Sequence, residues 1–196
     1  MSKLISFAEV IESCLTHFRA QCWEYGQVPA YGSLVTVEQD ELTFYALVHQ
    51  SATTVADGSY AVQAYKKTEE ELQREQPQIF ELLKTTFIGL TVAHKLGENI
   101  KHTSAPVPTR MHAFVRYATD EECAFFTRDY GYLSVLFGHA PQVNVDELLL
   151  AFLIILQQKK LIIESDLIVL LRTYLLLCGN DYSRVRFLAQ RIHGSC

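Results

Sequence analysis

The apolar residues change their pattern near Pro141, and this change limits the folds open to the chain. Before Pro141, short segments such as 33–37 and 43–48 are rich in β-branched and aromatic residues and alternate with polar turns. Such segments favour strands. After Pro141 come Leu- and Ile-rich stretches, of which 148–156 is apolar without a break. A helix that is apolar all round has to be enclosed by other elements. The sequence therefore predicts strands first and packed helices afterwards.

The first part of the chain contains enough strand candidates for a closed sheet. A polar turn, Gln39-Asp40-Glu41, separates two of them and predicts a hairpin. Short strands in one sheet leave unpaired edges, and closure into a small barrel removes those edges. We therefore expect a small antiparallel β-barrel. Its candidate strands are 18–23, 33–37, 43–48, 60–62 after a turn at Asp57-Gly58, 111–117 and 132–137.

Helices are expected before, within and after this sheet. Apolar residues from Phe7 to Phe18 recur at helical spacing, and a stripe from Ile79 to Leu90 predicts a helix as far as Leu96. Helix N-terminal signatures, including two Thr-x-x-Glu capping boxes, occur at Thr68, Thr119, Asn144 and Asp181. The last two predicted helices cover 166–178 and 182–193.

These elements predict an α+β fold: a small antiparallel β-barrel with inserted helices, followed by a C-terminal α-helical bundle. We place the barrel domain at residues 1–140 and the helical domain at residues 141–196. Charge is distributed unevenly, because residues 1–156 carry 11 basic and 19 acidic side chains, whereas residues 157–196 carry 6 basic and 3 acidic ones. The net charge of −5 disfavours nonspecific binding of nucleic acid by the whole surface.

Part of the chain, about residues 18–118, resembles the HAS-barrel family. The resemblance is carried by the segments 34–37, 44–49, Lys67-Thr68-Glu69-Glu70-Glu71-Leu72 and 76–85. That family is named after the small barrel at the start of HerA-type helicases and of ATP synthase subunits, where a nucleotide-binding domain follows. Here about eighty residues of mostly helix follow instead, and the chain has no Gly-x-x-x-x-Gly-Lys-Ser/Thr phosphate loop. The resemblance thus implies a barrel without the ATPase domain.

Catalytic and cofactor motifs are absent from the sequence. The seven histidines show no His-Glu-x-x-His spacing, and Gly-x-Ser-x-Gly does not occur. The five cysteines form no Cys-x-x-Cys pair; Cys14, His17 and Cys22 offer three metal ligands, whereas a structural zinc site takes four. We predict no catalytic residue and no cofactor. A metal-dependent enzyme that uses Cys and His is kept as an alternative.

Binding residues are easier to nominate than catalytic ones. In the last predicted helix, Arg184, Arg186 and Arg191 are candidate partner-binding residues, for phosphate or for an acidic protein surface. Arg184 and Arg191 share a helical face. The aromatic residues Trp23, Tyr25, Tyr31 and Tyr45 fit a core or an interface better than a base-stacking site, because the cations such a site needs are scarce nearby.

The leading hypothesis is a noncatalytic protein-interaction module, an adaptor, assembly factor or regulator that docks through its barrel onto a protein partner. That partner is an ATPase-type assembly or a second copy of the chain. The alternative binding function is a nucleic-acid-associated accessory protein of a helicase or nuclease system. A cytoplasmic location is expected, because the N-terminus does not read as a signal peptide and no apolar run reaches the roughly 18–20 residues of a membrane helix.

Overall fold

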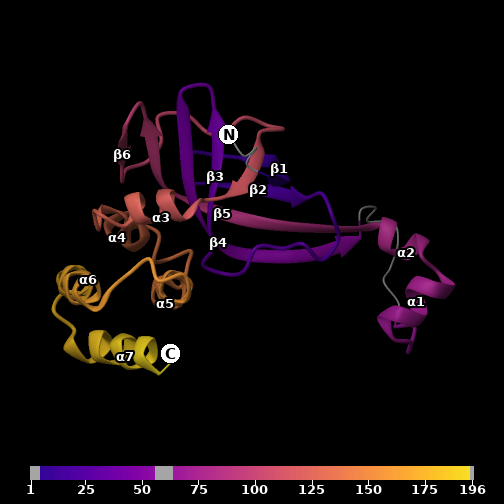
Figure 1. The fold of residues 1–196 in the computed structure, drawn as a ribbon. Coiled ribbons are helices and arrows are strands. Elements are labelled where there is room, and N and C mark those ends of the chain that lie inside the picture. The colour runs from indigo at the N-terminus through magenta and orange to yellow at the C-terminus, as the bar shows by residue number, and fades with distance from the viewer. Residues whose placement is uncertain (1–4, 56–63, 195–196) are drawn as a thin grey trace.

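The computed structural model describes residues 5–55 and 64–194 of the chain. Within these ranges seven strands form one antiparallel sheet, and helices lie to one side of it and at the far end of its longest hairpin (Figure 1). The predicted turn at Asp57-Gly58 and the predicted strand 60–62 lie outside the described residues. The strands are β1 (Ser6–Ser13), β2 (His17–Cys22), β3 (Leu34–Gln39), β4 (Leu42–Val55), β5 (Leu83–Leu96), β6 (Asn99–Lys101) and β7 (Phe114–Tyr117).

The sheet closes into a six-stranded barrel. Its strand order is β2-β1-β7-β3-β4-β5, and pairing of β2 with β5, from His17 opposite Leu90 to Gln21 opposite Thr86, joins the two ends. β6 pairs with the last residues of β5, His94–Leu96, and is not one of the six strands of the barrel. The predicted hairpin is confirmed. β3 and β4 pair from Leu34 opposite Leu47 to Gln39 opposite Leu42, and Asp40 in their turn has a positive φ of 53°. The predicted α+β fold with a small antiparallel barrel is therefore confirmed.

Three of the predicted elements are wrong. Residues 7–18 form no helix but the hairpin of β1 and β2, in which bulges interrupt the alternation of buried and exposed residues. Residues 79–96 form only one helical turn, α2 (Gln78–Glu81), before the long strand β5. Residues 132–137 belong to helix α4 (Gly131–Gly138), because Tyr132, Leu133 and Leu136 all reach the core from one helical face.

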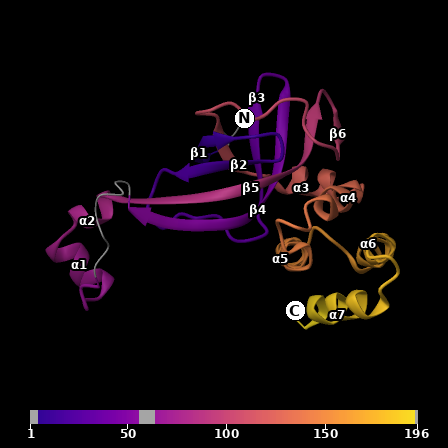
Figure 2. The ribbon, with the colours of Figure 1, turned by 180° about the vertical axis from the view of Figure 1, so that it is seen from behind.

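An arm projects from the barrel. β4 and β5 pair over nearly their whole length, from Leu42 opposite Leu96 to Val55 opposite Leu83. The outer end of this ribbon carries α1 (Glu69–Glu75) and the single turn α2, so the inserted helix predicted after Thr68 is confirmed (Figures 1 and 2). The capping box predicted at Thr68 is present, since Glu71 N–H donates to the threonine hydroxyl and Thr68 N–H donates to the Glu71 carboxylate. Neither α1 nor α2 contains a buried residue.

The remaining helices pack against the barrel. They are α3 (Asp120–Phe126), α4, α5 (Val145–Gln158), α6 (Glu164–Leu177) and α7 (Tyr182–His193), with the predicted N-caps Thr119, Asn144 and Asp181 all in place. One core fills the barrel, and a second joins β4 and β5 to these helices. In both views α5 lies beside the barrel, and α6 and α7 lie farther out (Figures 1 and 2). No helix in the described ranges has the length and apolar content to cross a membrane.

Candidate functional site

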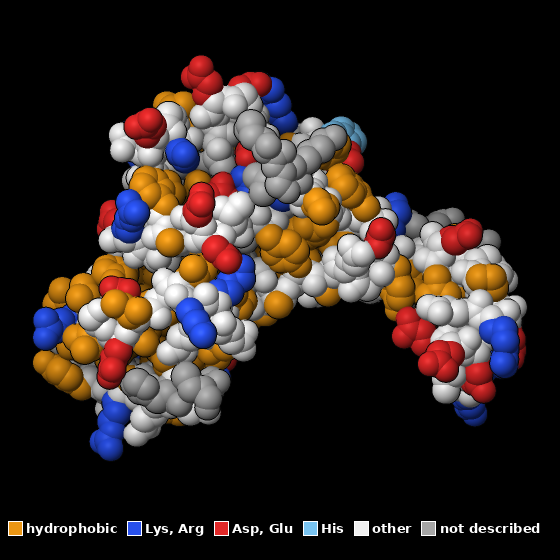
Figure 3. Space-filling model, viewed as in Figure 1, with side chains coloured by type: hydrophobic (Ala, Val, Ile, Leu, Met, Phe, Trp, Pro, Cys, Tyr) orange, Lys and Arg blue, Asp and Glu red, His pale blue; other side chains and the backbone are white. Residues whose placement is uncertain are grey.

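An aromatic pair is exposed on the outside of the barrel. Trp23, directly after β2, and Phe114, the first residue of β7, are 52% and 58% exposed. Their rings meet edge to face, with centroids 5.3 Å apart and an interplanar angle of 88°. Strand β1 lies between them, because Glu9 pairs with Phe114 on one side and with Gln21 of β2 on the other. Figure 3 shows hydrophobic side chains gathered on this part of the molecule.

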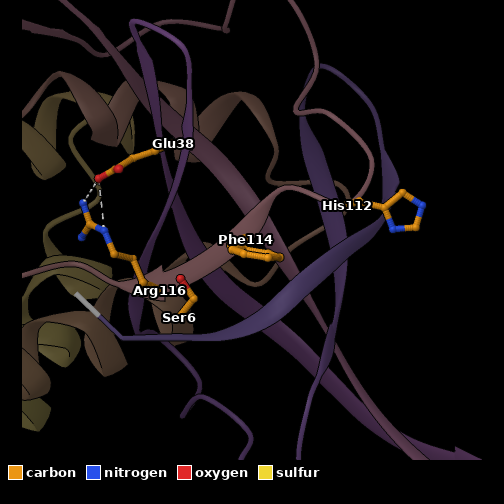
Figure 4. Close-up of a pocket in the computed structure, with 5 residues that line it drawn as sticks. All are labelled: Ser6, Glu38, His112, Phe114 and Arg116. Atoms are coloured by element: carbon orange, nitrogen blue, oxygen red, sulfur yellow. Dashed lines mark hydrogen bonds and ion pairs between the residues drawn. The ribbon is translucent and has the colours of Figure 1, made fainter. Parts of the chain in front are cut away.

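A hollow of about 290 Å³ lies beside Phe114. Arg116 forms one wall, and its guanidinium points toward Glu38 of the neighbouring β3, whereas Phe114 lies between Arg116 and His112 (Figure 4). The lining residues are Ser6, Glu38, His112, Phe114 and Arg116. The hollow and the aromatic pair share Phe114, so they form one continuous surface. We call Trp23, Phe114 and this hollow the barrel-face site.

Arg116 is held by two carboxylates. Its side chain is only 7% exposed, and it donates to Glu38 and, at 2.7 and 2.8 Å, to the two oxygens of Glu122 in α3. Hydrogen bonding to Glu122 raises the pKa of Arg116. Burial alone would raise the pKa of Glu122, but the hydrogen bonds from Arg116 and from the Thr119 backbone hold it below its usual range. Both groups are therefore charged at neutral pH.

Carboxylates outnumber cations among the residues of the barrel-face site and their hydrogen-bond partners. One guanidinium faces two carboxylates, and Glu38 is mostly exposed. A third carboxylate, Glu9, accepts from His112 Nδ1 at 2.5 Å when that nitrogen carries the proton. An arginine that two glutamates already bind has no free charge to offer an anion. The arrangement is suited to a cation, which the exposed carboxylate and the aromatic faces can both attract.

The predicted partner-binding arginines lie on α7, away from the barrel-face site. Arg184 donates from Nε and Nη2 to Asp146 of α5 at 2.7 and 2.6 Å, and Arg191 donates to the next residue, Glu147, with one bond of 3.0 Å. They share a helical face as predicted, and that face binds α5. Arg186 is exposed on another face. A contact between these arginines and a partner stays a prediction.

The three nominated metal ligands are not brought together. Cys14 lies in the turn before β2, with its Sγ 3.1 Å from Nδ1 of His17, whereas Cys22 is buried at the opposite end of β2. Burial raises the pKa of Cys22 to about 11. For Cys14, burial acts in the same direction, but hydrogen bonds with Thr16 and with the His17 backbone bring its pKa below the usual value. Among the described residues no group of three or more His, Cys, Asp and Glu is placed to hold a metal ion.

A second hollow, of about 170 Å³, lies beside this turn. Its lining includes His17 and His49 but no carboxylate. Burial lowers the pKa of His49, and the neighbouring His17 and His139 lower it further. The His17 ring lies next to the Cys14 thiol, but no acidic side chain lines the hollow to orient this ring as in a catalytic triad. A third histidine, His112, lines the first hollow at the barrel-face site and not this one.

Sequence reasoning identified one half of the barrel-face site. Trp23 was recognisable as an aromatic residue near the first strands, whereas Phe114 was expected only as part of a strand. Neighbouring residues of a strand point to opposite faces, so an inward-facing Val115 could have marked Phe114 as outward-facing. The convergence of Glu38, Arg116 and Glu122 from three separate elements has no local sequence signal. No protein family model matches the chain, and a search of curated proteins finds no match either.

Proposed function

We propose that the protein is a noncatalytic interaction module that docks through its barrel onto a protein partner, as an adaptor, assembly factor or regulator. The observation that carries the proposal is the exposed Trp23–Phe114 pair beside a hollow whose arginine is already bound by two glutamates. Large aromatic residues contribute much of the binding energy at protein interfaces, because they bury a large area with few rotatable bonds. The resemblance to the barrels of ring ATPases supports the same role.

The chemistry of the site favours a partner segment with an exposed arginine or lysine. A cation of the partner would lie against the Trp23 or Phe114 ring, with Glu38 and Glu9 as counter-charges. The negative balance of residues 1–156 adds long-range attraction for such a segment.

The same charges argue for a protein rather than a nucleic acid. Bases could stack on Trp23 and Phe114, but a single-strand site also needs a positive groove along the backbone. Here Arg116, beside the Phe114 ring, is already bound by Glu38 and Glu122, and two of the three arginines of α7 already bind Asp146 and Glu147. The proposal includes a cytoplasmic location, where thiols such as Cys14 stay reduced.

Affinity capture with paired variants tests the proposal. The purified chain is used to capture proteins from an extract of its native cells, and the captured protein is identified by mass spectrometry and then purified. Its affinity is measured for the wild type, for Trp23→Ala/Phe114→Ala and for Leu96→Ala, whose side chain is 51% exposed at a different place. We expect the double variant to bind at least about 30-fold more weakly, as for interface residues of this type, and the control to bind normally.

Two further measurements sharpen the test. Binding should weaken with added salt, and Glu38→Lys should weaken it further, because the partner segment is expected to be basic. The proposal fails if the partner binds the double variant as tightly as the wild type. Tight binding of a nucleotide with turnover by the pure protein would also overturn it.

A further inference from the structure

Helix α6 leaves a row of apolar side chains in solvent. Its inward face supplies Leu167, Leu170 and Tyr174 to the core. On the opposite side Ile168, Val169 and Leu176 are 48%, 46% and 71% exposed. Figure 3 shows hydrophobic side chains gathered over the place that α6 occupies in Figure 1. We call Glu164, Ile168, Val169, Arg172 and Leu176 the α6 outer face.

Two opposite charges flank the centre of this face at equal distances. Glu164 lies four residues before Ile168, and Arg172 lies four residues after it. Residues four apart lie on the same side of a helix, so the three side chains form one line. Glu164 and Arg172 are both exposed, and within the described part of the chain neither forms one of the ion pairs.

This spacing makes the α6 outer face complementary to itself. If a second α6 lies antiparallel across it, with the two-fold axis at Ile168, each Glu164 opposes Arg172 of the other copy. A two-fold interface uses the same surface on both subunits, so one favourable pair is always made twice. Parallel packing in register would place like charges together. The line of charges therefore selects the antiparallel arrangement.

We propose that the protein forms a homodimer through antiparallel packing of α6 against α6 of a second copy. Ile168 and Val169 supply the apolar contact, and two Glu164–Arg172 ion pairs fix its register. The occupant is a second copy because its charge pattern is the one this face complements. This surface is separate from the barrel-face site, so dimerisation goes beyond the proposed docking function and can fail or hold independently of it.

Charge-reversal variants of the full chain test the proposal. Oligomeric state and dimer Kd are measured by light scattering and sedimentation for the wild type, Glu164→Arg, Arg172→Glu and Glu164→Arg/Arg172→Glu. Each single variant places like charges opposite one another twice, so we expect the dimer Kd to rise at least about tenfold. The double variant swaps the two charges on each copy, so opposite charges face one another again and the dimer should be restored. Lys101→Glu, an equal charge change on the exposed surface of β6, should leave the Kd unchanged.

Folding and association are separated by a second readout. Glu164 lies in the first turn of α6, where a negative charge also interacts favourably with the helix dipole, so the Tm and circular dichroism of each variant are recorded. The double variant Glu164→Arg/Arg172→Glu loses the interaction with the helix dipole just as Glu164→Arg does, but it should still form a dimer. Ile168→Asp should give a folded monomer.

The proposal is overturned if the wild type is monomeric up to about 200 µM, a concentration at which even a weak interface would be populated. It is equally overturned if Ile168→Asp remains dimeric, if either single variant associates as Lys101→Glu does, or if the double variant stays monomeric.

Discussion

The guanidinium of Arg184 in α7 binds the carboxylate of Asp146 in α5 through two hydrogen bonds, of 2.7 and 2.6 Å. Tyr174 of α6 donates its hydroxyl to the same carboxylate at 2.6 Å. The guanidinium carbon also lies 5.5 Å from the centre of the Phe137 ring in α4. One carboxylate at the start of α5 thus joins the last three helices, and Arg184 has a structural role whatever its role in binding.

Replacement of Arg184 by Met should destabilise the protein by about 1–3 kcal/mol, because Asp146 would lose its charge-assisted hydrogen bonds while half-buried. Arg184→Lys should recover only part of this, since an ammonium group cannot make the bidentate contact. The free energy of unfolding is measured by urea titration. Arg186→Met serves as the control and should change it by less than about 0.5 kcal/mol. Equal effects of the two methionine variants would contradict the structural role of the pair.

The hydrogen bonds to Asp146 should also make the free energy of unfolding depend on pH in the acidic range. Burial by itself would raise the pKa of Asp146, but the hydrogen bonds from Arg184 and Tyr174 hold it below its ordinary value of 3.8. A carboxylate with a depressed pKa contributes its full stabilisation above that ordinary value, and the contribution disappears as the pH falls through the folded-state pKa. The wild type should therefore be more stable than Asp146→Asn at pH 7, and the difference should narrow below about pH 4. Urea titrations from neutral to acidic pH measure it. A difference that stays constant into that acidic range would contradict the assignment.

The barrel was predictable from the sequence, whereas some of its strands were not. Segments 33–37 and 43–48 are rich in β-branched and aromatic residues, are separated by a polar turn and form one hairpin, so local pattern and final structure agree. β1 is different, because bulges within its pairings break the alternation, and Phe7, Val10 and Ile11 then coincide with helical spacing. β5 pairs with both β4 and β2, with Phe87 in the barrel core and Val92 in the core beneath the helices. A strand buried on both faces loses its period-two signal.

The site was less accessible to sequence reasoning than the fold. The basic residues of α7 stand out by charge, yet Arg184 and Arg191 find their counter-charges in α5, 38 and 44 residues earlier in the chain. Arg116 likewise meets Glu38 across a strand pair that depends on closure of the barrel. Such long-range pairs follow from the topology, and no local pattern in the sequence encodes them.

Cys14 should be the most reactive of the described cysteines. Its thiol is exposed and its pKa is lowered by hydrogen bonds that outweigh burial, whereas burial raises the pKa of Cys22 and of Cys123 to about 11. Because the thiolate is the nucleophile, iodoacetamide at pH 7 should modify Cys14 at least about tenfold faster than the two buried thiols. Peptide mass spectrometry follows each site separately. Thr16→Val removes one hydrogen bond to Cys14 and should slow its reaction. Modification of Cys22 or Cys123 at the same rate as Cys14 would show that this assignment is wrong.

Gly32 should be far less tolerant of substitution than Gly26, although both adopt nearly the same backbone conformation. Their φ angles are +84° and +83°, a region that costs any L-residue about 1 kcal/mol or more. A Cβ at Gly26 would meet open space, whereas at Gly32 it would lie 2.7 Å from both Ala151 Cβ and the Phe152 nitrogen of α5. Gly26→Ala should therefore show the backbone cost alone. Gly32→Ala should add the displacement of α5 from the barrel, a further loss of about 1–3 kcal/mol in the free energy of unfolding. Urea titration compares the two variants with the wild type. Equal losses would mean that α5 does not pack on this turn in solution.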